Sequence, residues 1–219
     1  MNSSAWLLFV LFLVVAATDW VAVDLGSKRL EYVAKPGCMV VLIGAALVLD
    51  PVDDGARIAL VVALTLSLLG DIFLMLPGRQ PGSSGPNLFI VGLAAFLAGH
   101  LAYVVGFGLE GIDLAGLGVG LVPVALIIAT VGRRVVAAVE TSEEPEMALP
   151  VSAYIGVIST MVLFAFGTGD PRAQAGALLF AGSDSLIAWS RFVRQWPWAP
   201  MAVIVSYHVA QALLLLSFT

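Results

Sequence analysis

Long apolar runs separated by short polar breaks form the pattern of this chain. Each run is about 20 residues long, the length at which an α-helix crosses the hydrocarbon core of a bilayer. The breaks, such as 50–55, 77–82 and 167–171, are rich in Gly, Pro and Asp. The pattern predicts an all-α bundle of eight transmembrane helices in a single membrane domain, residues 1–219. The predicted spans are residues 6–23, 32–49, 56–76, 88–109, 114–131, 147–166, 173–192 and 198–218.

Composition agrees with a membrane protein. Of the 219 residues 60% are hydrophobic and 11% are charged, and the mean hydropathy is +1.03. A soluble domain is about 45–50% apolar and about 25% charged, so this composition excludes a soluble protein. The net charge of −5 and the absence of a basic cluster exclude nucleic-acid binding. Cys38 is the single cysteine, so an intrachain disulfide is impossible and a cysteine-based metal site is not expected.

The basic residues are divided unevenly between the two sides of the predicted bundle. Cytoplasmic loops carry an excess of Lys and Arg, so the richer side should face the cytoplasm and both termini should face outward. Arg57 and Arg172 fall on the side of the termini. The opposite side receives Lys28, Arg29, Lys35, Arg79, Arg133, Arg134, Arg191 and Arg194.

Two carboxylates lie well inside predicted spans. Asp71 follows Gly70 in the third span, and Asp184 follows Ser183 in the seventh. A charge at the bilayer centre costs about 2.5–3.5 kcal/mol on insertion scales, and it is tolerated where it faces the bundle interior or a water-filled cavity. The alternative is that each aspartate only hydrogen-bonds a neighbouring helix.

Further polar side chains share helix faces or depth with these aspartates. His100 and Tyr103 are three residues apart, and Tyr207 and Gln211 are four apart, so each pair shares a face. Asp19, Lys35 and Arg191 lie in the same half of the predicted membrane as Asp71, the half toward the side rich in Lys and Arg. His208 lies beside Tyr207 in sequence. We expect these groups to converge on one cavity that opens toward the cytoplasm.

Five segments resemble the YhhN family of integral membrane proteins, which includes the lysoplasmalogenases. They are residues 32–36, 67–75, 92–103, 176–185 and 207–213, and they extend from the second span to the last. The resemblance implies an eight-helix membrane hydrolase. Characterised members cleave the vinyl-ether bond of lysoplasmalogens, giving a fatty aldehyde and a glycerophospho-base. Asp71 and Asp184 match the two aspartates that are taken in the family as active-site residues.

Vinyl-ether hydrolysis needs residues of this kind. Protonation at carbon gives an oxocarbenium ion, so the reaction needs an acid, an anion near the developing cation and a positioned water. Two carboxylates that share a proton meet these needs, as in glycosidases. Which aspartate is the acid is left open. The candidate residues are Asp71 and Asp184 for catalysis, His100, Tyr103, Tyr207, Gln211 and Ser183 in support, and Lys35 and Arg191 for the lipid phosphate.

The expected partners are an ether lysolipid and the bilayer, with no nucleic acid, no cofactor and no metal; the oligomeric state is not predicted. Three alternatives stay open at this point. A metal-dependent lipid hydrolase would draw its ligands from His100, His208, Asp71 and Asp184. A transporter would use the same charges as a proton relay. A purely structural membrane protein would have no need of these ionisable groups.

Overall fold

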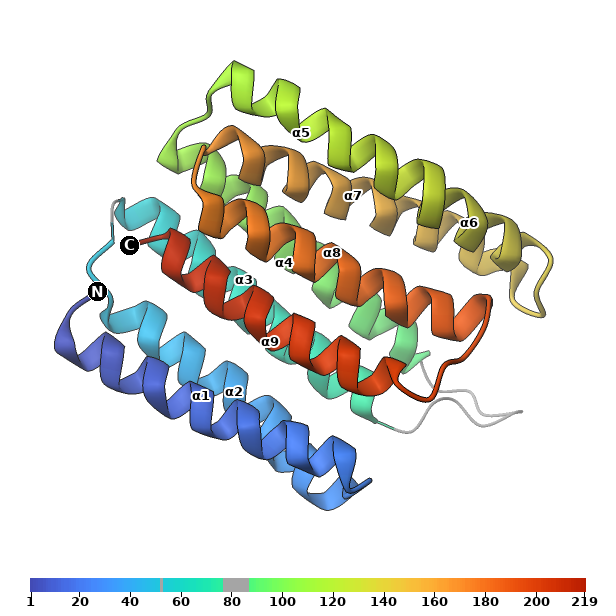
Figure 1. Ribbon diagram of the computed structural model, residues 1–219, viewed down its shortest axis with the longest axis horizontal. Helices are drawn as coiled ribbons and strands as arrows, with labels where there is room; N and C mark the ends of the chain where they lie inside the picture. Colours follow the sequence, from blue (N-terminus) through green and yellow to red (C-terminus); the bar gives the residue numbers. More distant parts are fainter. Residues whose placement is uncertain (52, 77–86) are drawn as a thin grey trace. The chain divides into compact units, whose positions relative to one another are not determined.

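The computed structural model describes residues 1–51, 53–76 and 87–219. Over these ranges the chain is helical and contains no strand, which confirms the all-α class (Figure 1). The helices are α1 (Ser3–Asp24), α2 (Lys28–Val48), α3 (Asp54–Met75), α4 (Leu88–Glu110), α5 (Leu114–Ile127), the π-helical turn η1 (Ile128–Gly132), α6 (Arg133–Glu140), the 3₁₀ turn η2 (Pro145–Met147), α7 (Ala148–Gly167), α8 (Pro171–Phe192) and α9 (Ala199–Ser217).

The predicted spans coincide with these helices to within a few residues at most ends. Seven helices in the described ranges are long and apolar enough to cross a bilayer, with α5, η1 and α6 counted as one helix. The chain is therefore a multi-pass helical membrane protein. α8, the seventh predicted span, is not among the seven, because Gln174, Ser183 and Asp184 lower its hydropathy. The break predicted at 77–82, with Arg79, lies outside the described residues.

Polar residues in the breaks begin the helices that follow them. Asp53 caps α3, Asp113 caps α5 and Asp170 caps α8, each by accepting a hydrogen bond from a backbone N–H of the first turn. The distances are 2.8, 2.8 and 2.7 Å. Such caps satisfy N–H groups that have no partner inside the helix, and the side chain of Asn2 serves α1 in the same way. The polar breaks thus fix where the apolar helices start.

The chain divides into two compact units, and the first comprises Met1–Gly106 with Thr219. In this unit α1 and α2 run antiparallel, and the Asn2 side chain at the start of α1 donates a hydrogen bond to the carbonyl of Val48 at the end of α2 (Figure 1). α3 returns along α2, and the Tyr32 hydroxyl donates to the Met75 carbonyl at 2.9 Å. The start of α2 and the end of α3 therefore lie together.

The second unit comprises Phe107–Phe218. Small residues bring its helices close: a Cβ at Gly176 on α8 would lie 2.9 Å from Leu214 on α9, and a Cβ at Gly116 on α5 would overlap the Phe166 carbonyl oxygen on α7. The π-helical turn joins α5 to α6 without a break in the helix. As a result, the helix predicted to end at residue 131 continues to Glu140.

Candidate functional site

Asp71 and Lys35 form an ion pair inside the first unit. Lys35 Nζ on α2 lies 3.1 Å from Asp71 Oδ1 on α3. The Asp71 side chain is 2% exposed and that of Lys35 is 17% exposed. A charge buried to this degree requires a charged or hydrogen-bonding partner, and each residue supplies one to the other. The structure thus pairs a predicted catalytic residue with a predicted phosphate-binding residue.

Glycine packing explains the Gly-Asp motif that contains Asp71. A Cβ at Gly70 would lie 2.5 Å from the Phe96 ring of α4, and a Cβ at Gly99 would lie 3.3 Å from the Ala63 carbonyl oxygen of α3. A side chain at Gly70 would require the Phe96 ring to move, and one at Gly99 would require a small shift of α3 or α4. The motif therefore holds Asp71 at a close contact between two helices.

The other candidate residues of the first unit are buried on α1 and α4. His100 and Tyr103 are 1% and 0% exposed on α4, one helical turn apart as predicted. Asp19 on α1 is fully buried. These three residues, together with Asp71 and Ser67, are the buried polar side chains of the described part of this unit.

Asp184 is held by a residue that the sequence analysis missed. The hydroxyl of Tyr154 on α7 donates a hydrogen bond to Oδ2 of Asp184 on α8. Tyr154 is 9% exposed. Its signal in the sequence is a single phenol within an apolar span, and the sequence does not show which residue that phenol meets. Tyr154 now joins the candidate site.

Ser183 and Asp184 form hydrogen bonds with different helices. Successive residues of an α-helix point about 100° apart, so adjacent side chains meet different helices. The Ser183 hydroxyl donates to the Val203 carbonyl of α9 at 3.1 Å, whereas Asp184 meets α7. The rings of Phe180 and Tyr207 make an edge contact with centroids 5.4 Å apart, which also joins α8 to α9. The Ser-Asp motif therefore links three helices of this unit.

Tyr207, His208 and Gln211 are buried on α9, at 4%, 1% and 0% exposure. Asp71 belongs to the first unit and Asp184 to the second. In the described residues no group of three His, Cys, Asp or Glu side chains is arranged to hold a metal ion.

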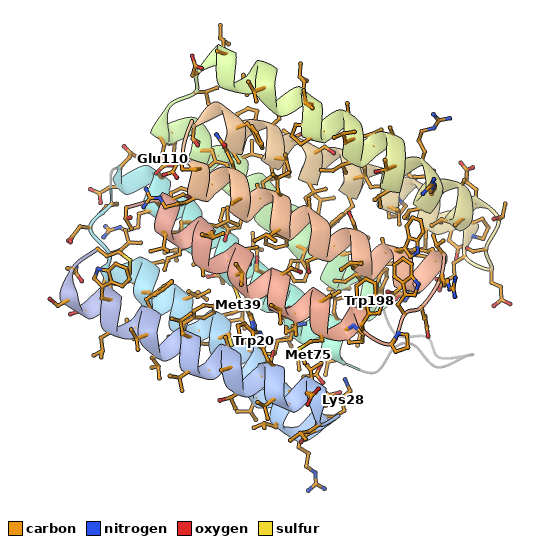
Figure 2. All side chains as sticks on the ribbon, in the orientation of Figure 1. Trp20, Lys28, Met39, Met75, Glu110 and Trp198 are labelled. Carbon is orange, nitrogen blue, oxygen red and sulfur yellow. The ribbon has the colours of Figure 1, made fainter. Side chains whose placement is uncertain are left out.

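Arg191, the second predicted phosphate ligand, pairs with a carboxylate at the end of α8. Its guanidinium lies 2.7 Å from Glu144 in the connection before α7. Close by in sequence, the Trp196 ring stacks on both Trp189 and Trp198, with centroids 5.8 and 5.2 Å apart. Tryptophan is enriched where helices meet the membrane surface. This end of α8 thus combines a charge pair with an aromatic stack, of which Figure 2 labels Trp198.

Asp170 and Arg172 form a second charge pair, at the start of α8. Burial raises the pKa of the Asp170 carboxyl, but hydrogen bonds from the Arg172 guanidinium and backbone outweigh burial and hold the pKa below its ordinary value. The guanidinium donates to both carboxylate oxygens, at 2.7 to 3.1 Å. The pair reinforces the helix cap and lies apart from the candidate residues in sequence.

The chain is similar to one protein family and to several named proteins. The family model of YhhN matches residues 30–218. Lysoplasmalogenase TMEM86B of Homo sapiens is 35% identical over 155 residues, which cover 71% of this chain and 61% of that protein. The protein of the same name from Rattus norvegicus is 33% identical over 71% of this chain and 59% of its own length.

A bacterial relative aligns over a longer stretch. Lysoplasmalogenase of Mycobacterium bovis is 33% identical over 184 residues, 82% of this chain and 67% of that protein. The matched part spans less than two thirds of the two mammalian relatives. No solved structure matches the chain. Since the family model covers nearly all of the helical chain, this protein belongs to the YhhN family.

Proposed function

We propose that this protein hydrolyses the vinyl-ether bond of lysoplasmalogens within the membrane. The observation that carries the proposal is the 33–35% identity to proteins named lysoplasmalogenase, over 71% to 82% of this chain. The reaction consumes one water for each lysoplasmalogen, and the products are a fatty aldehyde and a glycerophospho-base. The buried Asp71 and the partly buried Asp184 support the assignment, because this chemistry needs carboxyl groups in a poorly hydrated site.

The reaction proceeds by proton transfer to carbon. An acid delivers a proton to the alkenyl carbon remote from the ether oxygen, and the positive charge is shared by the adjacent carbon and that oxygen. Water adds to this oxocarbenium carbon and gives up a proton to a base. The resulting hemiacetal loses the proton of its hydroxyl, the bond from that carbon to the glycerol oxygen breaks, and the glycerol oxygen takes a proton and becomes a hydroxyl. The proton that the base took from water returns to the acid, which restores both carboxyl groups.

The contacts of the two aspartates support different roles. Asp71 has an ammonium partner, Lys35, at 3.1 Å, so its negative charge is compensated and it suits the anion that faces the oxocarbenium ion and takes the proton from water. Asp184 has a neutral partner, the Tyr154 hydroxyl, which can donate to a carboxylate or accept from a carboxylic acid. Asp184 therefore suits the acid, since both of its protonation states keep a partner.

The supporting residues keep the roles expected from the sequence, with two refinements. Ser183 is proposed to orient α8 through its bond to Val203. The two predicted phosphate ligands are proposed as alternatives: Lys35, which lies beside Asp71, or Arg191, which would exchange Glu144 for the phosphate. His100, Tyr103, Tyr207 and Gln211 remain proposed donors near the reacting groups.

The proposed topology has eight spans, with α8 as the least apolar, both termini outside and the cavity open to the cytoplasm. It rests on the excess of Lys and Arg at one end of the spans. A reporter fused after Thr219 should report an extracytoplasmic location, and one placed at residues 140–146 a cytoplasmic one. A cytoplasmic signal from the C-terminal fusion would overturn the orientation.

The activity is tested by incubating the purified protein in detergent with a lysoplasmalogen and with its saturated lyso-ether analogue. Lipid analysis should find aldehyde from the first only, and absence of aldehyde would overturn the proposal. Turnover without a membrane gradient would separate a hydrolase from a transporter. Turnover that survives a chelator would separate acid–base chemistry from a metal-dependent hydrolase.

A further inference from the structure

A cavity of about 190 Å³ opens beside the Lys35–Asp71 pair in the first unit. Lys28, Glu31, Tyr32 and Lys35 of α2 line it on one side, and Leu74 and Met75 of α3 line it on the other. The four α2 residues are spaced i, i+3, i+4 and i+7, which places them on one helix face. Figure 2 labels Lys28 and Met75 at this end of the unit. Pockets for whole drug-sized ligands hold about 300–1,000 Å³, so this cavity suits one part of a lipid.

The exposure of the side chains falls from the outer end of the cavity toward the protein interior. The side chain of Lys28 is 75% exposed, those of Glu31 and Lys35 are each 17% exposed, and that of Asp71 is 2% exposed. Seven residues of helix span about 10 Å, so the lining passes from exposed Lys28 to partly buried Lys35 over two helical turns. A lipid whose head group lies between Lys28 and Lys35 would therefore direct its glycerol ether inward, toward Asp71.

The charges of the lining alternate in sign. Ammonium groups stand at Lys28 and Lys35, and a carboxylate stands between them at Glu31. Glu31 and Lys28 pair at 2.7 Å, but the lysine is 75% exposed, and a pair with such a mobile, hydrated partner contributes little, so a ligand can displace Lys28 at low cost. The Tyr32 hydroxyl is bound to the Met75 carbonyl, which fixes the aromatic ring as part of the wall.

We propose that this cavity holds the lipid head group, and that Glu31 makes it prefer a zwitterionic phospho-amine to an anionic phosphate. The inference rests on the proposed function for the identity of the lipid. The lysines attract the phosphate, and Glu31 pairs with the ammonium, which also lies within reach of the Tyr32 ring. A head group without an amine leaves the Glu31 carboxylate facing a phosphate, and like charges repel.

The test compares two lysoplasmalogens that differ only in the head group, phosphoethanolamine or bare phosphate. Glu31→Gln keeps the shape and removes the charge, so the preference in kcat/KM for the amine should fall by about three- to fivefold, through KM. Glu143→Gln is the matched control, because Glu143 is an exposed glutamate of the connection before α7. An unchanged preference in Glu31→Gln would overturn the inference.

A binding experiment separates this inference from the proposed reaction. The saturated lyso-ethers with the same two head groups have no vinyl ether, and their affinity is measured on the purified full chain. One outcome is a protein that binds the analogues and yet cleaves neither lysoplasmalogen. If Glu31→Gln then still shifts the ratio of its affinities for the two analogues, the head-group site stands and the hydrolase proposal fails. Equal affinity for water-soluble glycerophosphoethanolamine and for the lipid analogue would overturn the lipid assignment of the cavity.

Discussion

The hydroxyl of Tyr154 donates a hydrogen bond to Oδ2 of Asp184, joining α7 to α8 at the Ser-Asp motif. The bond orients a carboxyl group that the proposed reaction uses as its acid. Tyr154 would therefore act as a positioning residue, through Asp184 rather than on the substrate.

Tyr154→Phe removes the hydroxyl and keeps the ring. We expect kcat to fall about three- to tenfold, the loss typical of one hydrogen bond, with KM almost unchanged and the pH–rate profile displaced. Thr160→Val is the control, because it removes a hydroxyl from the same helix that bonds only to the Gly156 carbonyl at 2.9 Å. A profile that coincides with that of the control would contradict the positioning role.

Asp71→Asn and Asp184→Asn each remove one titratable group while keeping its size. Each substitution should lower kcat by about 10²–10⁴-fold, because neither role can be filled by the other residue. The double variant should be scarcely worse than either single one, since groups that act as a unit are not additive. Retention of more than roughly a tenth of the activity by a folded single variant would sink the two-carboxylate mechanism.

Lys35→Met should destabilise the protein by about 3 kcal/mol, because it leaves the Asp71 carboxylate buried without this cation. Adding Asp71→Asn should recover much of the lost stability and none of the activity. Thermal unfolding in detergent measures the first effect and aldehyde release the second. A double variant as unstable as Lys35→Met alone would show that Lys35 stabilises the fold through other contacts.

Arg191 and Glu144 should have opposite effects on substrate binding. If the phosphate lies at Arg191, Arg191→Gln should raise KM and leave kcat nearly unchanged, because a phosphate contact is similar in the ground and transition states; an unchanged KM would assign the phosphate to Lys35. Glu144→Gln should lower KM, because it releases the guanidinium that Glu144 holds at 2.7 Å. Steady-state kinetics on both variants check the pair, and a fall of kcat alone in Arg191→Gln would assign the residue to the chemistry instead.

The Asp170–Arg172 pair should make stability depend on pH at the acid end. The pKa of Asp170 is lower in the folded protein, so its contribution is complete above the ordinary aspartate pKa of about 3.9 and is lost as the pH falls through the lower folded value. Asp170→Asn keeps a helix cap and removes the ion pair. The difference in unfolding free energy should be below about 1 kcal/mol, because Arg172 is 42% exposed. It should shrink between pH 5 and pH 2, measured by denaturant unfolding; a constant difference would contradict the assignment.

The apolar runs made the helices predictable, but not every end or contact. The predicted span ends at residue 131, because the hydropathy falls at Arg133 and Arg134. The helix nevertheless continues to Glu140, since arginine also favours the helical conformation. The two aspartates stood out because acids are rare in apolar spans. The partners Lys35 and Tyr154 were not predictable as partners, since the register between two helices depends on packing that periodicity does not encode.

The π-helical turn at Ile128–Gly132 has a geometric consequence for the rod that runs from Leu114 to Glu140. One extra residue in a helical turn rotates everything beyond it by about 100°. Past this turn, Val135 and Val139 are buried while Arg133 and Arg134 are exposed. The extra residue of the π-helical turn therefore changes the rotational register between α5 and α6. It lets the two halves of this helix be aligned independently, and deletion of a single residue here would turn Arg133 into the buried position that Gly132 now holds.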